Sequence, residues 1–125
     1  MRTLLLLVLP AVFLAACGCS FLGAGDVMYR RGGDTLMVCE NGGFALTLDT
    51  TIIEGRYAQT AAIEGTDGVT GEPVFTLTAT EAGTWTSPEL GDGWQLATLD
   101  RYELDHAHVQ CADLETRAWW NATAQ

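Results

Sequence analysis

The chain has 125 residues, of which sixteen are acidic and six are basic, so its net charge is −10 at pH 7. A chain of this length forms one small domain with a single hydrophobic core. The charge excludes a nucleic-acid-binding protein, because affinity for phosphate needs clustered basic side chains and the sequence contains no lysine. The acidic residues are scattered, as on a solvated surface, and they suit a basic protein partner.

The first 16 residues have the pattern of a secretion signal. Arg2 gives a positive start, and residues 4–16 are apolar, with Pro10 as the one interruption. This run is too short to cross a bilayer, since a helix needs about 20 residues for roughly 30 Å of hydrocarbon. Its length is typical of the apolar part of a signal peptide. We therefore expect residues 1–16 to form a signal helix that is cleaved.

The signal ends in Leu14-Ala15-Ala16-Cys17, which resembles the lipobox of bacterial lipoproteins. The resemblance implies cleavage after Ala16 and lipidation of the Cys17 sulfur with a diacylglyceryl group carrying palmitate-type chains. Two or more acyl chains hold a protein firmly on a membrane. Gly18 stands where an Asp often marks inner-membrane retention in that family, so the outer membrane, facing the periplasm, is favoured. The alternatives are a plain secretory peptide or a buried N-terminal helix.

Removal of the signal leaves residues 17–125, and these divide into three parts. We expect a lipidated tether over 17–26, a single β domain over 27–120 and a loose tail over 121–125. Cys19, inside the tether, is expected to be a free thiol or to form an intermolecular bridge near the membrane.

The composition of the chain is typical of β structure. Sixteen threonines stand against two serines, and fourteen glycines punctuate short alternating runs. Phe75 and Leu77, for example, fall on one face of a strand, with Thr76 and Thr78 on the other. The predicted strands are 27–30, 35–39, 44–48, 52–63 as one strand or two, 74–79, 84–86, 94–104, 107–111 and 116–120. No segment after residue 16 shows a clear helical period, although 100–108 is ambiguous. We therefore predict an all-β domain, a small antiparallel barrel or sandwich.

Two cysteines of the domain, Cys39 and Cys111, each end a predicted strand. Export places them in an oxidising compartment, where such a pair usually forms a disulfide. Closing a loop of about 72 residues stabilises a domain by roughly 4 kcal/mol in the chain-entropy model. The alternative is two buried free thiols.

The two histidines of the chain, His106 and His108, give the one arrangement with possible metal chemistry. On a strand, both would point to the same face and bind Zn²⁺ or Cu²⁺, with Asp105 or Glu103 completing the site. Surface histidines without a metal are the commoner outcome. We therefore predict no metal and no cofactor, and keep these two residues as weak candidates.

Catalysis is not indicated by any motif. Neither Ser20 nor Ser87 lies in a Gly-x-Ser-x-Gly elbow, and no glycine-rich phosphate loop is present. The pair Trp119-Trp120 would place its rings on opposite faces of a strand, so that one is buried and the other is available for binding. The sequence therefore predicts a binding protein rather than an enzyme.

A second resemblance lies in the domain. The segment Val38-Cys39-Glu40-Asn41-Gly42-Gly43-Phe44-Ala45-Leu46-Thr47-Leu48 resembles the opening of the membrane-bound inhibitors of C-type lysozyme. Those proteins are small acidic β-barrel lipoproteins with a disulfide. The resemblance covers roughly 15 of the 109 residues that follow the signal, and that family's inhibitory loop, with its Ser and Lys, has no counterpart here.

Three functions follow from these observations. The first is a lipid-anchored cell-envelope protein with a non-catalytic, acidic β domain for binding or structural contact. The alternative is an inhibitor of a basic hydrolase such as C-type lysozyme. A distant third is a metal-binding envelope protein that uses His106 and His108.

Overall fold

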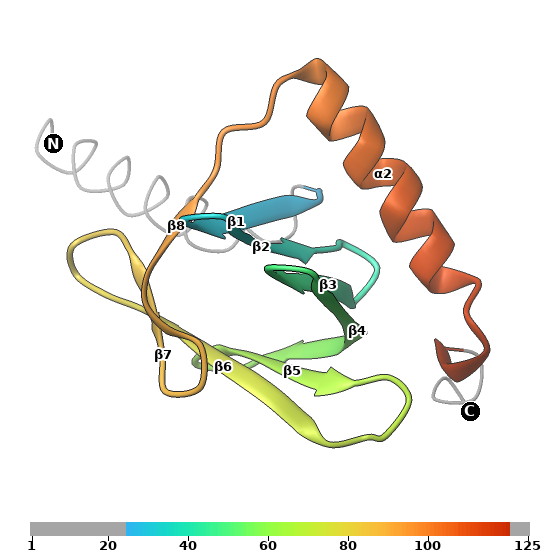
Figure 1. The fold of residues 1–125 in the computed structure, drawn as a ribbon, viewed down its shortest axis with the longest axis horizontal. Helices are drawn as coiled ribbons and strands as arrows, with labels where there is room; N and C mark the ends of the chain where they lie inside the picture. Colours follow the sequence, from blue (N-terminus) through green and yellow to red (C-terminus); the bar gives the residue numbers. More distant parts are fainter. Residues whose placement is uncertain (1–24, 121–125) are drawn as a thin grey trace, which may run out of the picture.

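The computed structural model describes residues 25–120, in which eight antiparallel strands close into a barrel and one long helix lies on its outer face (Figure 1). The strands are β1 (Val27–Arg31), β2 (Asp34–Val38), β3 (Gly43–Leu48), β4 (Thr51–Gln59), β5 (Ile63–Asp67), β6 (Pro73–Ala79), β7 (Trp85–Ser87) and β8 (Gly91–Leu96). The helix is α2 (Arg101–Glu115). The signal segment, Cys17, Cys19 and the tail 121–125 lie outside the described residues.

Each strand pairs with its neighbours in the chain, and β1 pairs with β8 to close the barrel. The closing register joins Tyr29 to Leu96 and Arg30 to Gln95. The all-β prediction is therefore confirmed, as a barrel. The predicted segment 52–63 is two strands, β4 and β5, which form a hairpin.

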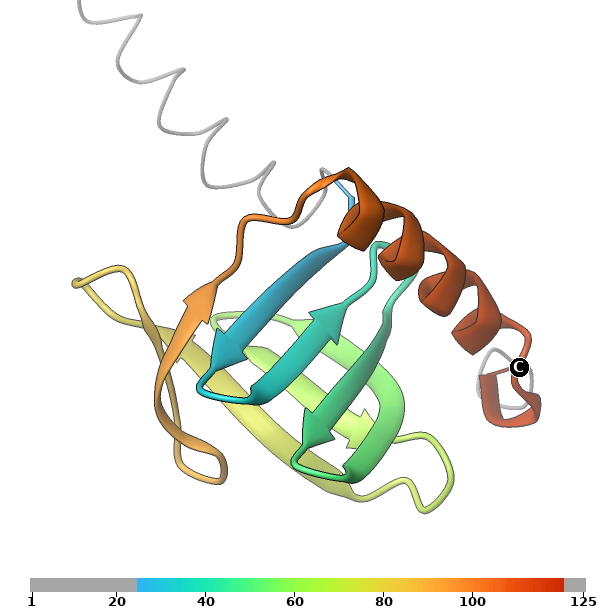
Figure 2. The same cartoon turned by 45° about the horizontal axis from the view of Figure 1, so that its top comes forward.

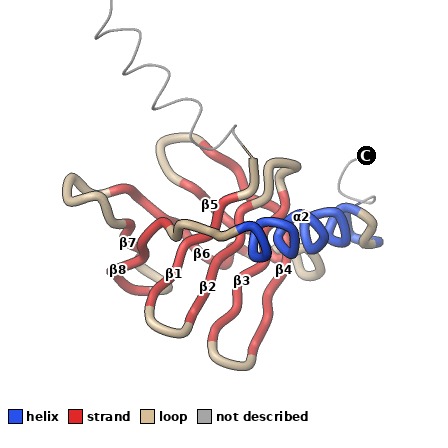
Figure 3. The backbone as a smooth tube through the Cα atoms, turned by 90° about the horizontal axis from the view of Figure 1, so that it is seen from above, coloured by secondary structure: helices blue, strands red, loops and turns tan. Residues whose placement is uncertain are grey.

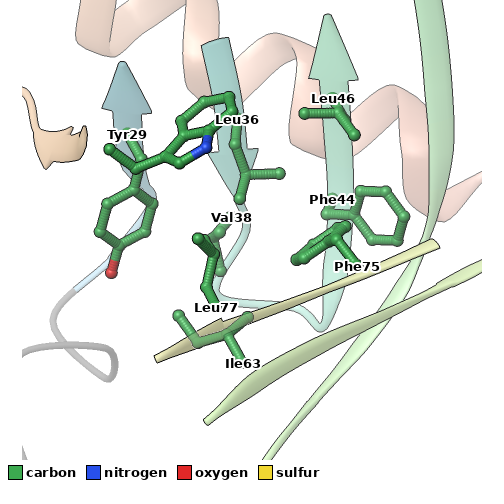
Figure 4. Packing of buried hydrophobic residues seen from close by; sticks show 9 residues of the cluster. Tyr29, Leu36, Val38, Phe44, Leu46, Ile63, Phe75 and Leu77 are labelled. Atoms are coloured by element: carbon green, nitrogen blue, oxygen red, sulfur yellow. The ribbon is translucent and has the colours of Figure 1, made fainter. Parts of the chain in front are cut away.

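The barrel interior is filled by side chains at alternate positions of the strands, as the period of two requires. Phe44 and Phe75 meet edge to face, with ring centroids 5.0 Å apart. The nine buried residues of this core are Tyr29, Leu36, Val38, Phe44, Leu46, Ile63, Phe75, Leu77 and Trp94 (Figure 4). The interior is a packed core, so a binding site must be sought on the outside.

The C-terminal part differs from the prediction. β8 ends at Leu96, and α2 contains the predicted strand 107–111 and residues 101–104 of the predicted strand 94–104. Residues 116–120, predicted as a strand, include a helical turn at 118–120. Asp100 caps the helix by accepting a hydrogen bond from the Glu103 amide, and the Glu103 side chain accepts one from the Asp100 amide. This capping box fixes the helix start, and the strand prediction overlooked it.

The helix covers the outer face of β2 and β3 (Figure 2). Two outward side chains of these strands, Met37 and Ala45, are buried beneath it. Its own buried residues are Ala107, Cys111 and Leu114, spaced four and three apart on one face. Figure 3 shows the helix crossing the barrel wall away from the β1–β2 and β3–β4 turns.

A disulfide joins Cys39, just after β2, to Cys111 in α2, with the Cα atoms 5.7 Å apart. The predicted bridge is confirmed, although Cys111 lies within a helix rather than at the end of a strand. Asn41 adds a second link, since its side-chain amide donates to the Cys111 carbonyl over 3.0 Å. The β2–β3 turn and the helix are therefore joined covalently and by hydrogen bonding.

Candidate binding pocket

An open pocket of about 840 Å³ lies where β4, the loop after β5 and the C-terminal helical turn meet. Arg56 and Tyr57 contribute from β4, residues 66–71 from β5 and its loop, and Trp119 from the turn. The size falls within the range of small-molecule sites, which are mostly apolar clefts with a few polar groups. This is the candidate site of the domain.

The loop at the pocket edge is held by one carboxylate. Asp67 accepts hydrogen bonds from the Val69 amide over 2.7 Å and from the Thr70 amide over 2.9 Å. The Gly71 amide closes the loop on the Asp67 carbonyl over 2.9 Å. Val69, at the tip, is 83% exposed. The loop therefore presents an apolar side chain to solvent from an ordered backbone.

The charge of Asp67 should make this loop sensitive to acid. The backbone hydrogen bonds from Thr70 and Val69 lower the pKa of Asp67 below its ordinary value of 3.8. A carboxylate with a lowered pKa in the folded state stabilises it above the unfolded pKa, and this stabilisation is lost as pH falls through the folded pKa. We expect the protection of the Val69 and Thr70 amides, relative to intrinsic exchange, to fall below about pH 4, as the pH approaches the lowered pKa of Asp67.

Amide hydrogen exchange followed by NMR between pH 6 and pH 2.5 measures this effect. The variant Asp67→Asn keeps an acceptor oxygen without the charge, so its loop should exchange with a much flatter pH profile. The same acid transition in both proteins, after correction for intrinsic exchange, would show that Asp67 does not hold the loop.

Trp119 lies against the backbone of this loop. A Cβ atom added to Gly68 would stand 2.4 Å from the Trp119 ring, so only glycine allows the indole to lie so close. The neighbouring Trp120 is buried, with its ring centroid 5.7 Å from that of Trp119. The two rings are thus placed by a helical turn rather than by a strand, and Trp119 is the one that lines the pocket.

Strand β4 contributes two polar side chains to the pocket, Arg56 and Tyr57. The Arg56 guanidinium lies 3.8 Å from the centre of the Trp120 ring, a cation–π contact. Its Nη1 atom is buried and has no hydrogen-bond partner among the described residues. The Tyr57 hydroxyl donates to the Cys39 carbonyl over 2.7 Å. Burial, followed by the nearby Asp26 and Glu40 carboxylates, raises the pKa of Tyr57.

The histidines are not brought together. His106 and His108 lie on α2, where two residues differ by about 200° around the axis, so the expectation of one shared strand face is wrong. The His106 ring stacks on Tyr102 at 3.9 Å. Of the carboxylates considered as further ligands, Asp105 pairs with Arg101 over 3.4 Å and Glu103 with Arg30 over 2.5 Å. These side chains have separate partners.

His108 instead contacts Asp26, the residue before β1, with 2.7 Å between Nδ1 and the carboxylate. The Asp26 side chain is only 7% exposed and also accepts a hydrogen bond from the Glu40 amide over 2.8 Å. Within residues 25–120, the one group of possible metal ligands within 4.8 Å of one another is Asp26, Cys39 and Cys111. Its two sulfurs are joined to each other, so it is a structural cluster that fixes the end of the tether segment to the domain.

Comparison with family models, with curated proteins and with solved structures gives no match to the chain. In the described part of the chain, no helix is both long enough and apolar enough to span a bilayer. The function is therefore inferred from the sequence and from the geometry of the pocket.

Proposed function

We propose that this protein is a lipid-anchored binding protein of the cell envelope, with Cys17 as the anchor and the pocket around Trp119 as the binding face. The anchor is supported by the order Leu14-Ala15-Ala16-Cys17 after an apolar run. The binding face is supported chiefly by one observation, the open pocket of about 840 Å³ that a partly buried tryptophan lines.

The composition of the pocket favours contact over catalysis. Trp119 and Val69 provide apolar area, and exposed aromatic or aliphatic side chains around a cleft are typical of sites that bind ligands or partners. Ser87, the one serine among residues 25–120, is used in the turn before β8, where its Oγ accepts from the Leu90 amide over 3.0 Å. We therefore propose a domain that acts by binding at a membrane surface.

Site-specific photo-crosslinking in intact cells tests the binding face. A benzophenone amino acid replaces Val69 at the edge of the pocket. The matched control carries the same amino acid in place of Ile52, which is 60% exposed and lies beside the β3–β4 turn. We expect adducts from position 69 that are absent from position 52 and that disappear when Trp119→Ala is added. Identical adducts from both positions would contradict the pocket as the binding face.

Inhibition of a basic hydrolase is the second candidate. The acidic charge, the barrel and the disulfide at Cys39 agree with the resemblance of residues 38–48 to the membrane-bound inhibitors of C-type lysozyme. A lysozyme activity titration decides this candidate. Inhibition that weakens with increasing salt supports it, because charge attraction is screened. Full lysozyme activity at micromolar protein rejects it.

A further inference from the structure

We infer that the pocket binds a small carboxylate with an apolar body, and that Arg56 receives the carboxylate group. The inference rests on the proposed function, since it assigns a ligand class to that binding face. The observation behind it is that, among the described residues, one arginine of this strongly acidic protein has no carboxylate partner.

Among residues 25–120, every arginine except Arg56 has a carboxylate partner. The pairs are Arg30 with Glu103 at 2.5 Å, Arg31 with Asp34 at 3.0 Å, Arg101 with Asp105 at 3.4 Å and Arg117 with Glu54 at 3.3 Å. With sixteen acidic residues in the chain, a guanidinium without such a partner is unexpected. Partly buried charged groups are normally paired or hydrogen-bonded, so Arg56 has unused capacity to bind an anion.

Arg56 is held in place without a counter-ion. Its backbone pairs with Gly43 across β3 and β4, and its guanidinium stacks on the Trp120 ring. Trp120 is itself fixed against the β2–β3 turn, where a Cβ atom on Gly43 would come within 3.0 Å of the ring. Stacking occupies the face of the guanidinium, and among the described residues no carboxylate pairs with its edge, whose planar fork matches a carboxylate. The group is therefore preorganised for a ligand.

The surroundings of Arg56 define the rest of the ligand. Trp119 and Val69 line the same pocket and would contact an aromatic or aliphatic body. Asp67 also lines it, and the negative charge of the domain disfavours ligands with several negative charges. A ligand with one carboxylate on an apolar body of moderate size would pair with Arg56 and pack against Trp119 and Val69.

Binding of 3-phenylpropionate and of its neutral amide to the full chain in neutral detergent tests the inference, by isothermal titration calorimetry. The two probes differ only in charge. We expect the acid to bind at least about tenfold more tightly than the amide, because a charge-assisted bidentate hydrogen bond is roughly twice as strong as a neutral one. Arg56→Met should remove this preference, so that the acid binds no more tightly than the amide.

Two further variants separate charge recognition from structural damage. Arg101→Met removes the same charge from a side chain that is 88% exposed on α2, and it should keep the preference. Arg56→Lys keeps the positive charge but lacks the planar guanidinium, so it should retain part of the preference for the acid. Retained amide binding in Arg56→Met shows that the pocket is still formed.

Equal affinity of the wild-type protein for acid and amide would overturn the inference and leave the binding face intact. Binding of neither probe at millimolar concentration would also overturn it. The crosslinking comparison between positions 69 and 52 then decides the proposed function independently.

Discussion

The double variant Cys39→Ala/Cys111→Ala is expected to lose about 4 kcal/mol of unfolding free energy. The two cysteines are 72 positions apart, so the bridge removes a large amount of loop entropy from the unfolded chain. Domains of this size have total stabilities of roughly 5–15 kcal/mol, so the loss is a large fraction. Urea unfolding of the variant and the wild-type protein measures it.

The loss should be concentrated in α2. The helix buries only three side chains, so we expect the bridge and the Asn41 link to carry a large share of its docking, beside ion pairs such as Arg30 with Glu103. Amide exchange should show α2 losing protection before the barrel strands. Val109→Ala, an exposed position on the same helix, is the control and should change stability by less than about 0.5 kcal/mol. A loss below 1 kcal/mol, or unchanged exchange in α2, would contradict this role of the disulfide.

Trp94→Ala is expected to destabilise the barrel by about 3–5 kcal/mol. Trp94 is fully buried in the interior, and its ring lies 5.1 Å from the Arg31 guanidinium. Truncation leaves a cavity that the closed strands cannot fill without moving. The same substitution removes the cation–π contact. Denaturant unfolding measures the change.

Trp94→Phe provides the informative comparison. The Trp94 Nε1 atom is buried and has no hydrogen-bond partner among the described residues, which costs free energy in the folded state. Phenylalanine removes this donor and keeps most of the apolar volume. We expect a loss of about half that of the alanine variant or less. Equal losses in the two variants would show that Nε1 makes an important interaction.

Most of the barrel can be predicted from the sequence, because each strand shows its own alternation of apolar and polar residues. Phe44, Leu46, Phe75 and Leu77 alternate with small or polar residues, and this period fixes both strand type and inward face. The turn after Cys39 is marked by Gly42, which takes a φ of +98° that most residues avoid. Barrel closure follows once each strand pairs with the next.

The helix was harder to recognise because its apolar stripe is narrow. Ala107, Cys111 and Leu114 are its only buried residues, and the exposed Tyr102 and Val109 interrupt the pattern. The sequence signal for the helix is the capping box formed by Asp100 and Glu103. A helix that starts there places His106 and His108 on different faces.

The pocket could not be derived from the sequence. Arg56 and Trp119 are far apart in the chain and meet only because the disulfide docks α2 and carries the last turn to β4. The one hint in the sequence is the adjacent tryptophans 119 and 120, of which one is expected to serve binding. The role of Arg56 depends on the absence of a carboxylate partner among the described residues, which no local pattern encodes.

We propose that this domain works at a membrane surface, held by a lipid on Cys17. Mass spectrometry of the N-terminal peptide, from protein extracted from membranes, is the decisive experiment. We predict that the peptide begins at Cys17 and carries a diacylglyceryl group on the sulfur, with or without a further acyl chain on the amine. A peptide that begins at Met1, or an unmodified Cys17 in the membrane fraction, would contradict the claim.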